Sequence, residues 1–199
     1  RTIGPWKVSA MGLGCMQLSG MSSANASMLD EREGAFGVIH GALDAGVTLL
    51  DTADIYAPSW DTFGHHESLV GAAFKSWSGT TPQQAKVLIA NKGGITRGAG
   101  ESWCRSASLD YLLRAVENST KRLEVEKIQL WQHHRLDPSL VFEEQFENVL
   151  EIQSRGLVER IGVSNYNAKQ LRMAIKLGGR PARGGRIPGL IEYSPRDRH

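Results

Sequence analysis

Three short apolar runs in the chain end in residues that could do acid-base chemistry. Residues 47–50 are followed by Asp51 and Tyr56, residues 87–90 by Lys92, and residues 128–131 by His133 and His134. Short apolar runs of this kind predict buried parallel strands. Ligands of parallel α/β proteins bind at the C-terminal ends of the strands. The residues that follow these runs are therefore the candidate site.

Alternation of side chains along a strand indicates which of these residues can meet. Neighbouring side chains on a strand point to opposite faces, and residues two apart share a face. By this rule Asp51, Lys92 and His134 can converge on one interior, whereas His133 is expected to pack outward on the other face. Tyr56 lies just beyond its strand, in a loop that can fold over the mouth of that interior.

These residue types suit proton transfer to a carbonyl oxygen. A free tyrosine has a pKa of about 10, and a nearby ammonium favours the phenolate and lowers that pKa. Asp51 would hold Lys92, since a buried carboxylate is costly unless it is paired. A neutral histidine can hydrogen-bond the substrate oxygen. Together Tyr56, Lys92, Asp51 and His134 could protonate that oxygen while hydride reaches its carbon.

Segments with helical periodicity lie between the candidate strands. Apolar spacing and capping residues predict helices after Asp30 to Gly46 and over 67–77, 108–123, 142–154 and 168–177. Strands are expected over 8–18, 47–51, 86–94, 128–134, 160–163 and 187–193, with polar loops over 95–107 and 178–186. About six alternations predict parallel strands, in a doubly wound sheet or a barrel. Because no Gly-x-Gly-x-x-Gly joins a strand to a helix, we favour the (β/α) barrel.

The composition of the chain excludes several classes of protein. The chain of 199 residues is 41% hydrophobic, and its 23 basic and 21 acidic residues form no basic stripe. We expect one domain over residues 1–199, with no nucleic-acid partner and no membrane partner. With only Cys15 and Cys104, there is no disulfide framework, and a cytoplasmic location is expected. The chain starts at Arg1 without a signal-peptide pattern, so residues before it are expected to have been removed or not included.

Paired histidines invite a metal-site interpretation. His65 and His66, like His133 and His134, are adjacent in the chain. Barrel hydrolases do bind metals through histidines at strand ends. Adjacent side chains on a strand diverge, however, and the Lys92 ammonium would compete with a cation for Asp51. We therefore predict no metal site.

Taken together, the motifs resemble those of the aldo-keto reductase family. The matching segments are 12–14, 50–56, Gly64 with Glu67 and Gly71, 91–93, 132–138 and 161–165. The resemblance implies a (β/α)8 TIM barrel and reversible carbonyl reduction with NADP(H), NAD(H) being possible. It also implies that Asp51, Tyr56, Lys92 and His134 form the catalytic tetrad, with Tyr56 as the general acid.

The resemblance further implies where the cofactor would bind. Ser164 and Asn165 match the pair that hydrogen-bonds the nicotinamide carboxamide. The other implied cofactor-binding residues are Gly14, Cys15, Met16, Asp51 and Leu190. Leu190 stands where the family normally has a glutamine.

The resemblance stops after the sixth strand, so we expect a barrel truncated after about six βα units and incomplete at its C-terminus. The absent parts would include the pyrophosphate and adenosine sites. Three functions stay open: a reductase of a small-molecule carbonyl substrate, a catalytically impaired fragment, and a regulatory nicotinamide-binding subunit. The choice between NADP and NAD, the particular aldehyde or ketone and the oligomeric state also stay open.

Overall fold

A six-stranded parallel sheet forms the centre of the computed structural model, which describes residues 1–18, 32–178, 181–182, 185–186 and 191–192. Its strands are β3 (Leu13–Gly14), β4 (Leu49–Asp51), β5 (Leu88–Gly93), β8 (Ile128–His133), β9 (Val158–Val163) and β12 (Ile191–Glu192). Their spatial order is β12-β9-β8-β5-β4-β3, and every pairing is parallel. Because the spatial order follows the chain order without a reversal, the sheet resembles a barrel wall more than a doubly wound sheet.

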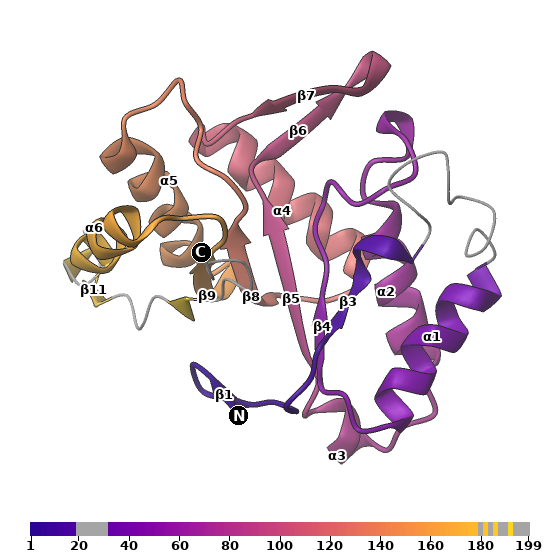
Figure 1. Ribbon diagram of the computed structural model, residues 1–199. Coiled ribbons are helices and arrows are strands. Elements are labelled where there is room, and N and C mark those ends of the chain that lie inside the picture. Colours follow the sequence, from indigo (N-terminus) through magenta and orange to yellow (C-terminus); the bar gives the residue numbers. More distant parts are fainter. Residues whose placement is uncertain (19–31, 179–180, 183–184, 187–190, 193–199) are drawn as a thin grey trace.

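Helices follow one another along the outside of this sheet (Figure 1). They are α1 (Arg32–Asp44), α2 (His65–Ser76), α4 (Leu109–Leu123), α5 (Phe142–Ser154) and α6 (Ala168–Gly178), with the short α3 (Thr81–Gln84) before β5. Short 3-10 turns are η1 (Cys15–Gln17), η2 (Trp60–Thr62) and η3 (Ala99–Glu101). Each long helix packs against the next one in the chain. This is the arrangement that right-handed crossovers between parallel strands produce.

The sheet divides the apolar side chains into two clusters. The inner cluster consists of Val8, Leu49, Leu88, Ala90 and Leu130. The outer cluster, between the sheet and the helices, includes Leu50, Ile89, Trp131, Ile161, Ile39, Val70, Val116 and Phe146. Leu49 and Leu50 are adjacent in the chain and belong to different clusters, as the period-two alternation of a strand requires. The face assignment made from the sequence is therefore confirmed.

The first predicted strand is shorter than expected. Residues 8–18 contain only β3 and the turn η1 in place of one continuous strand. Near the start of this segment, hydrogen bonds to side chains stand in place of backbone-to-backbone bonds with the next strand. Ser9 N donates to Thr48 Oγ1 at 2.8 Å, and Thr48 N donates to Ser9 Oγ at 2.9 Å. At Gly12 a Cβ would lie 2.9 Å from the Leu49 side chain, so the two segments touch there.

The expected polar loop over 95–107 is wrong: it contains a hairpin of β6 (Ile95–Gly98) and β7 (Ser102–Arg105). The hairpin projects past the C-terminal end of β5 (Figure 1). Arg97 holds it in place, donating to the carbonyl of Ala57 at 2.7 Å and to that of Pro58 at 3.1 Å. These are tertiary contacts of a buried guanidinium, so the local polar sequence did not reveal the strands.

Smaller hairpins were also missed. The chain begins with a pair of two-residue strands, β1 (Thr2–Ile3) and β2 (Trp6–Lys7). The segment 178–186, expected to be a loop, contains the antiparallel pair β10 (Pro181–Ala182) and β11 (Gly185–Arg186). The proposed cap Asp30 lies outside the described residues. Ser108 does occupy the N-cap position of α4, but its side chain makes no capping hydrogen bond.

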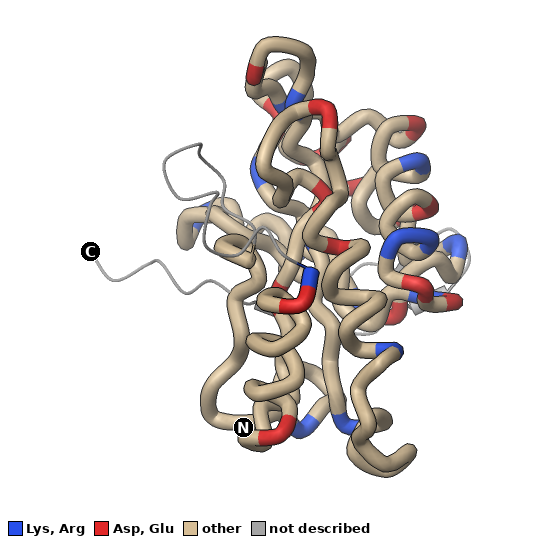
Figure 2. Tube along the Cα trace, turned by 90° about the vertical axis from the view of Figure 1, so that its right-hand side faces the viewer, with Lys and Arg blue, Asp and Glu red and all other residues tan. Residues whose placement is uncertain are grey.

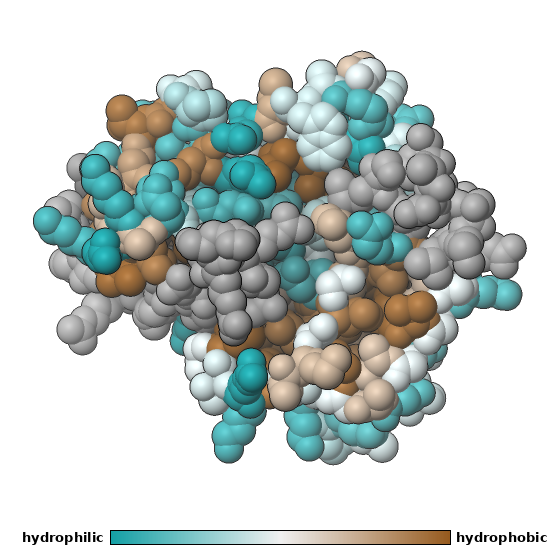
Figure 3. Space-filling view, viewed as in Figure 1, coloured by the Kyte–Doolittle hydropathy of each residue, from teal (hydrophilic) through white to brown (hydrophobic). Residues whose placement is uncertain are grey.

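The surface is mixed in charge and partly apolar. On the side shown in Figure 2, basic and acidic residues are interspersed along the helices. In Figure 3, hydrophobic residues gather in the lower half of the face, over the start of β3 and β4 and the end of α1. Within the described residues, none of the helices combines the length and the apolar character that crossing a membrane requires.

A close helix contact at Gly71 generates a test of the packing. A Cβ at this position would lie 2.6 Å from the carbonyl oxygen of Leu123, where α2 meets the end of α4. Gly71→Ala should therefore lower the free energy of unfolding by about 1–3 kcal/mol, measured by urea denaturation. Gly41→Ala in α1 is the matched control, because nothing lies within 4 Å of its Cβ. It should be neutral or stabilising by up to ~1 kcal/mol, and an equal loss in both variants would contradict this contact.

Candidate active site

A buried ion pair joins the ends of β4 and β5. Lys92 Nζ donates to Asp51 Oδ2 at 2.8 Å and to the carbonyl of Thr52 at 2.9 Å. Gln132, from β8, donates through Nε2 to the other carboxylate oxygen of Asp51 at 3.3 Å. Asp51 lies beside Ala90 in the register of the sheet, so Lys92 is two residues further along the same face. Three adjacent strands thus supply one connected polar group.

Tyr56 is positioned over this ion pair by the loop after β4. The N–H of Asp54 donates to the carbonyl of Lys92 at 3.0 Å, and the carbonyl of Tyr56 accepts from the N–H of His66 at 3.1 Å. The Lys92 ammonium lies 5.0 Å from the centroid of the Tyr56 ring. That ring meets the ring of His134 edge-on, with centroids 5.9 Å apart. The four residues expected to form the catalytic set therefore gather in one place.

A cavity of about 610 Å³ opens at this place. Its described lining comprises Met16, Asp51, Ile55, Tyr56, Lys92, Ile95, Trp103, Cys104, Arg105, His134, Arg135, Ser164 and Asn165. The cavity lies at the C-terminal ends of the strands, where parallel α/β folds bind ligands. A volume of this size accommodates a small organic molecule.

Charges around the cavity fix the protonation of two groups. Burial alone would lower the pKa of Lys92, but the Asp51 carboxylate and the Tyr56 phenol outweigh it and hold that pKa above its usual range. Burial, followed by the positive charges of Lys92 and Arg135, lowers the pKa of His134 to about 3. At neutral pH the site therefore contains an ammonium and a neutral imidazole.

The two neighbouring histidines are separated by the sheet, as alternation predicts. His134 lines the cavity, whereas His133 is fully buried on the helix side. There its Nδ1 lies 2.8 Å from the hydroxyl of Tyr166, and its ring stacks on Trp131 with centroids 6.5 Å apart. Burial lowers the pKa of His133 to about 4.

The residues expected to bind the cofactor are only partly together. Met16, Ser164 and Asn165 line the cavity along with Asp51. Asn165 has a φ of 61° and donates through Nδ2 to the carbonyl of His134 at 3.1 Å and to Ser164 Oγ at 2.9 Å. A left-handed backbone at a residue other than glycine costs free energy. These two hydrogen bonds hold Asn165 against the wall of the cavity.

Three further residues were expected to bind the cofactor, and their surroundings differ. Gly14 lies beside Asp51 in the sheet, and no atom lies within 4 Å of where its Cβ would be. The Cys15 side chain is fully buried in the outer cluster, and burial raises its pKa to about 12. Its thiol is therefore turned away from the cavity, and only its backbone is available to a ligand. Leu190 lies outside the described residues.

Several lining residues were not predicted from the sequence. Gln132, which does not line the cavity but donates to Asp51, shares the inner face with His134, and the alternation carried that signal. Trp103, Cys104 and Arg105 reach the cavity from the hairpin that was expected to be loop. Because that hairpin is fixed by distant contacts, no local pattern marks its residues as part of the site.

A second polar network lies behind the same strands, on the helix side. Asn91 Nδ2 donates to Glu67 Oε1 at 2.8 Å, and Arg122 of α4 forms an ion pair with Glu67. Burial, reinforced by the charge of Glu67, raises the pKa of Asp54 well above its usual range. This network connects α2 and α4 to the segment that contains Lys92.

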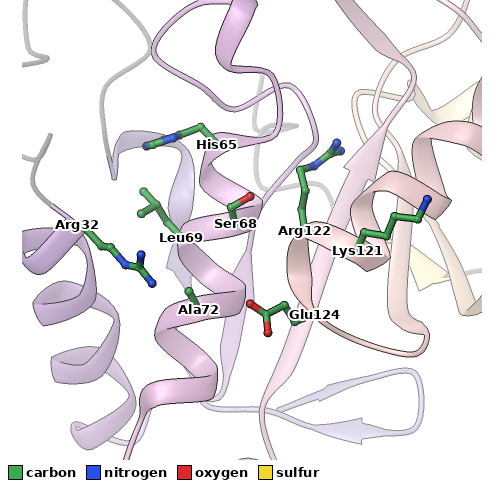
Figure 4. Close-up of a pocket in the computed structure, with 8 residues that line it drawn as sticks. All are labelled: Arg32, His65, Ser68, Leu69, Ala72, Lys121, Arg122 and Glu124. Atoms are coloured by element: carbon green, nitrogen blue, oxygen red, sulfur yellow. The ribbon is translucent and has the colours of Figure 1, made fainter.

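A hollow of about 570 Å³ on the outer surface, between α1, α2 and α4, is not part of this site (Figure 4). It contains Arg32, Lys121 and Arg122, but Arg32 extends toward α2 while the ends of Lys121 and Arg122 turn away from it (Figure 4). These cations do not converge on one point. No group of three or more His, Cys, Asp and Glu side chains in the described part of the chain could hold a metal ion.

Comparisons with known proteins agree on one family. The family model described as "Aldo/keto reductase family" matches residues 10–184. Probable aldo-keto reductase 1 of Glycine max is 34% identical over 169 residues, covering 85% of this chain and 45% of that protein. Aldo-keto reductase YhdN of Bacillus subtilis is 33% identical over 165 residues, covering 83% of this chain and 46% of that protein. The chain thus spans about half the length of these relatives.

A solved structure agrees with the sequence comparisons. The holo form of aldo-keto reductase AKR11C1 from Bacillus halodurans matches with a TM-score of 0.69 and 27% identity. The match covers 88% of this chain and 53% of that one. The six parallel strands and their helices therefore correspond to part of a TIM barrel.

Burial of His133 generates a test of the site's electrostatics. The pKa of His133 in the folded chain, about 4, lies below the ordinary histidine value of 6.5, so between these two values the unfolded chain binds the extra proton. The stability that His133 contributes is therefore lost as pH falls below 6.5. When the pH falls from 7 to 5, the free energy of unfolding of His133→Phe should rise by about 2 kcal/mol relative to that of the native chain, measured by urea unfolding.

The comparison between variant and native chain isolates this one group. Asp54, whose pKa burial raises, acts in the opposite direction in both proteins. A difference in the free energy of unfolding that does not change with pH would contradict a buried, neutral His133.

Proposed function

Because the chain belongs to the aldo/keto reductase family, we propose that it carries the catalytic half of an oxidoreductase that reduces an aldehyde or ketone to the alcohol. NADP(H) is the proposed cofactor, with NAD(H) as the alternative. The observation that carries the proposal is the convergence of Asp51, Tyr56, Lys92 and His134 on one cavity. Turnover of a carbonyl substrate would distinguish this function from that of a catalytically impaired fragment or a regulatory nicotinamide-binding subunit.

The described residues suit the nicotinamide end of such a cofactor. Ser164 and Asn165 present a hydroxyl and an amide to the cavity, groups that can hydrogen-bond a carboxamide. Open space at Gly14 leaves room beside Asp51. When bound, the reduced nicotinamide would supply hydride to the carbonyl carbon of the substrate.

The side chains of this chain would supply the proton and orient the carbonyl. The Tyr56 hydroxyl gives its proton to the carbonyl oxygen as hydride arrives at the carbon, which yields the alcohol. The Lys92 ammonium favours the phenolate that remains, and Asp51 holds that ammonium in place. The neutral imidazole of His134 hydrogen-bonds the carbonyl oxygen and orients it.

We further propose a cytoplasmic location and a small-molecule carbonyl substrate. Cys15 and Cys104 are both free thiols, and Cys104 is exposed at the cavity. An exposed free thiol is better preserved in a reducing compartment.

The decisive experiment replaces the proposed general acid. In the full-length protein, Tyr56→Phe should lower kcat for an aromatic aldehyde by about 100- to 10,000-fold, because the phenol hydroxyl is the proton source. The rate would be followed by the absorbance of NADPH, and NADPH affinity by tryptophan fluorescence. The affinity should change little, since the ring is kept.

Tyr111→Phe is the matched control. Its hydroxyl donates to the carbonyl of Ile95 at 3.1 Å and does not belong to the tetrad. The control should keep nearly native turnover. If Tyr56→Phe behaved like Tyr111→Phe, the assignment of the general acid would be wrong.

A second comparison tests the histidine assignment. His134→Ala should reduce turnover strongly, by about 100-fold or more, because it removes the group that orients the carbonyl oxygen. His133→Ala should affect stability more than kcat, because His133 packs against Tyr166 on the other face. Equal losses of kcat in two folded variants, checked by circular dichroism, would refute the distinction.

A further inference from the structure

Two arginines lie on one wall of the catalytic cavity, outside the tetrad. Arg105 comes from the rim strand β7, and Arg135 follows His134 directly in the chain. A guanidinium nitrogen of Arg105 donates to the carbonyl of Leu136 at 3.4 Å, which places it next to Arg135 along the chain. Both side chains are exposed to solvent at the mouth of the cavity.

No acidic side chain of the described segments pairs with either guanidinium. Asp51 is the only acidic residue in the described lining, and it is paired with Lys92. Like charges on one wall repel each other, and an anion bound between them would relieve this repulsion.

Two carboxylates of neighbouring segments are already engaged. Glu101, at the tip of the rim hairpin, pairs with Arg97 and accepts from the N–H of Trp60 at 3.0 Å. Asp137 accepts from the N–H of Ala107 at 3.0 Å and from the Ser139 hydroxyl at 2.6 Å. Neither is available to neutralise the arginines.

We propose that Arg105 and Arg135 recognise an anion, and that the preferred substrates are aldehydes or ketones with a carboxylate distant from the reacting carbonyl. This inference rests on the function proposed above. Arginine suits this task because its planar guanidinium binds a carboxylate through two parallel hydrogen bonds.

The rest of the wall suits a flat or short spacer between the two ends. Trp103, two residues before Arg105 on β7, lines the cavity and is 48% exposed. The guanidinium of Arg97 lies 4.8 Å from the centroid of the Trp103 ring. Ile55 and Ile95 add apolar surface. The carbonyl would thus meet Tyr56 while the carboxylate meets the arginines.

The test uses a matched pair of substrates in the full-length protein, 4-carboxybenzaldehyde and its methyl ester. Both present the same aldehyde, and only the first carries a charge at neutral pH. We expect kcat/KM for the acid to exceed that for the ester by about 10-fold, as charge-assisted hydrogen bonds predict. Arg105→Gln and Arg135→Gln should each reduce this ratio toward one, and Arg135→Lys should restore part of it.

Arg172→Gln is the matched control, since Arg172 is an exposed arginine on α6 that is absent from the described lining of the cavity. It should keep the native ratio. Equal kcat/KM for acid and ester in the native protein would overturn the proposal. So would a parallel loss for both substrates with a raised Kd for NADPH, because the arginines would then serve the cofactor's phosphates.

A binding measurement separates this inference from the proposed function. If neither aldehyde were turned over, the proposed function would fail. Binding of 4-(hydroxymethyl)benzoate, measured by tryptophan fluorescence, would then test whether the two arginines bind an anion, independently of turnover. Binding that is weakened about 10-fold in Arg135→Gln supports the anion site, and no binding to the native protein overturns it.

Discussion

The ion pair between Lys92 and Asp51 is the contact on which the geometry of the site depends. Both groups lie at the ends of neighbouring parallel strands, and Lys92 is only 6% exposed. Removing Asp51 would leave the buried Lys92 ammonium without its carboxylate, and breaking a buried pair in this way costs about 3–5 kcal/mol. The pair also requires the observed register, because a slip of one residue would turn Lys92 toward the helices. Packing of Leu49 and Leu88 on the inner face favours the same register.

The same strand ends are fixed from the other side by groups that do not reach the cavity. Asn91 precedes Lys92 and points outward, where it donates to the fully buried Glu67. Arg122 supplies the compensating charge, although burial still raises the pKa of Glu67 above its usual value. Because α2 and α4 meet closely at Gly71, movement of either helix would disturb this network. Because side chains alternate along β5, Lys92 faces the cavity, whereas its neighbour Asn91 belongs to the network that supports the site from behind.

Sequence reasoning succeeded where periodicity alone determines the structure. Helix α5 has the predicted bounds, and the inner faces of β4, β5 and β8 carry the side chains that alternation assigned to them. It failed at the rim, because the hairpin of β6 and β7 depends on Arg97, whose hydrogen bonds join residues far apart in the chain. Arg105, which lies on that hairpin, was missed for the same reason. Cys15 shows a different limit, since the motif that contains it does not indicate that its thiol faces the core.

The proposed tetrad comes from one continuous part of the sheet, and this makes its geometry independent of barrel closure. Asp51, Lys92 and His134 are carried by β4, β5 and the end of β8, which pair directly with one another in that order. Tyr56 is held by hydrogen bonds from the same segment and from α2. Closure of a barrel requires its first and last strands to pair, whereas β3 and β12 each pair on one side within the described residues. The positions of the acid-base groups are therefore set by local strand register.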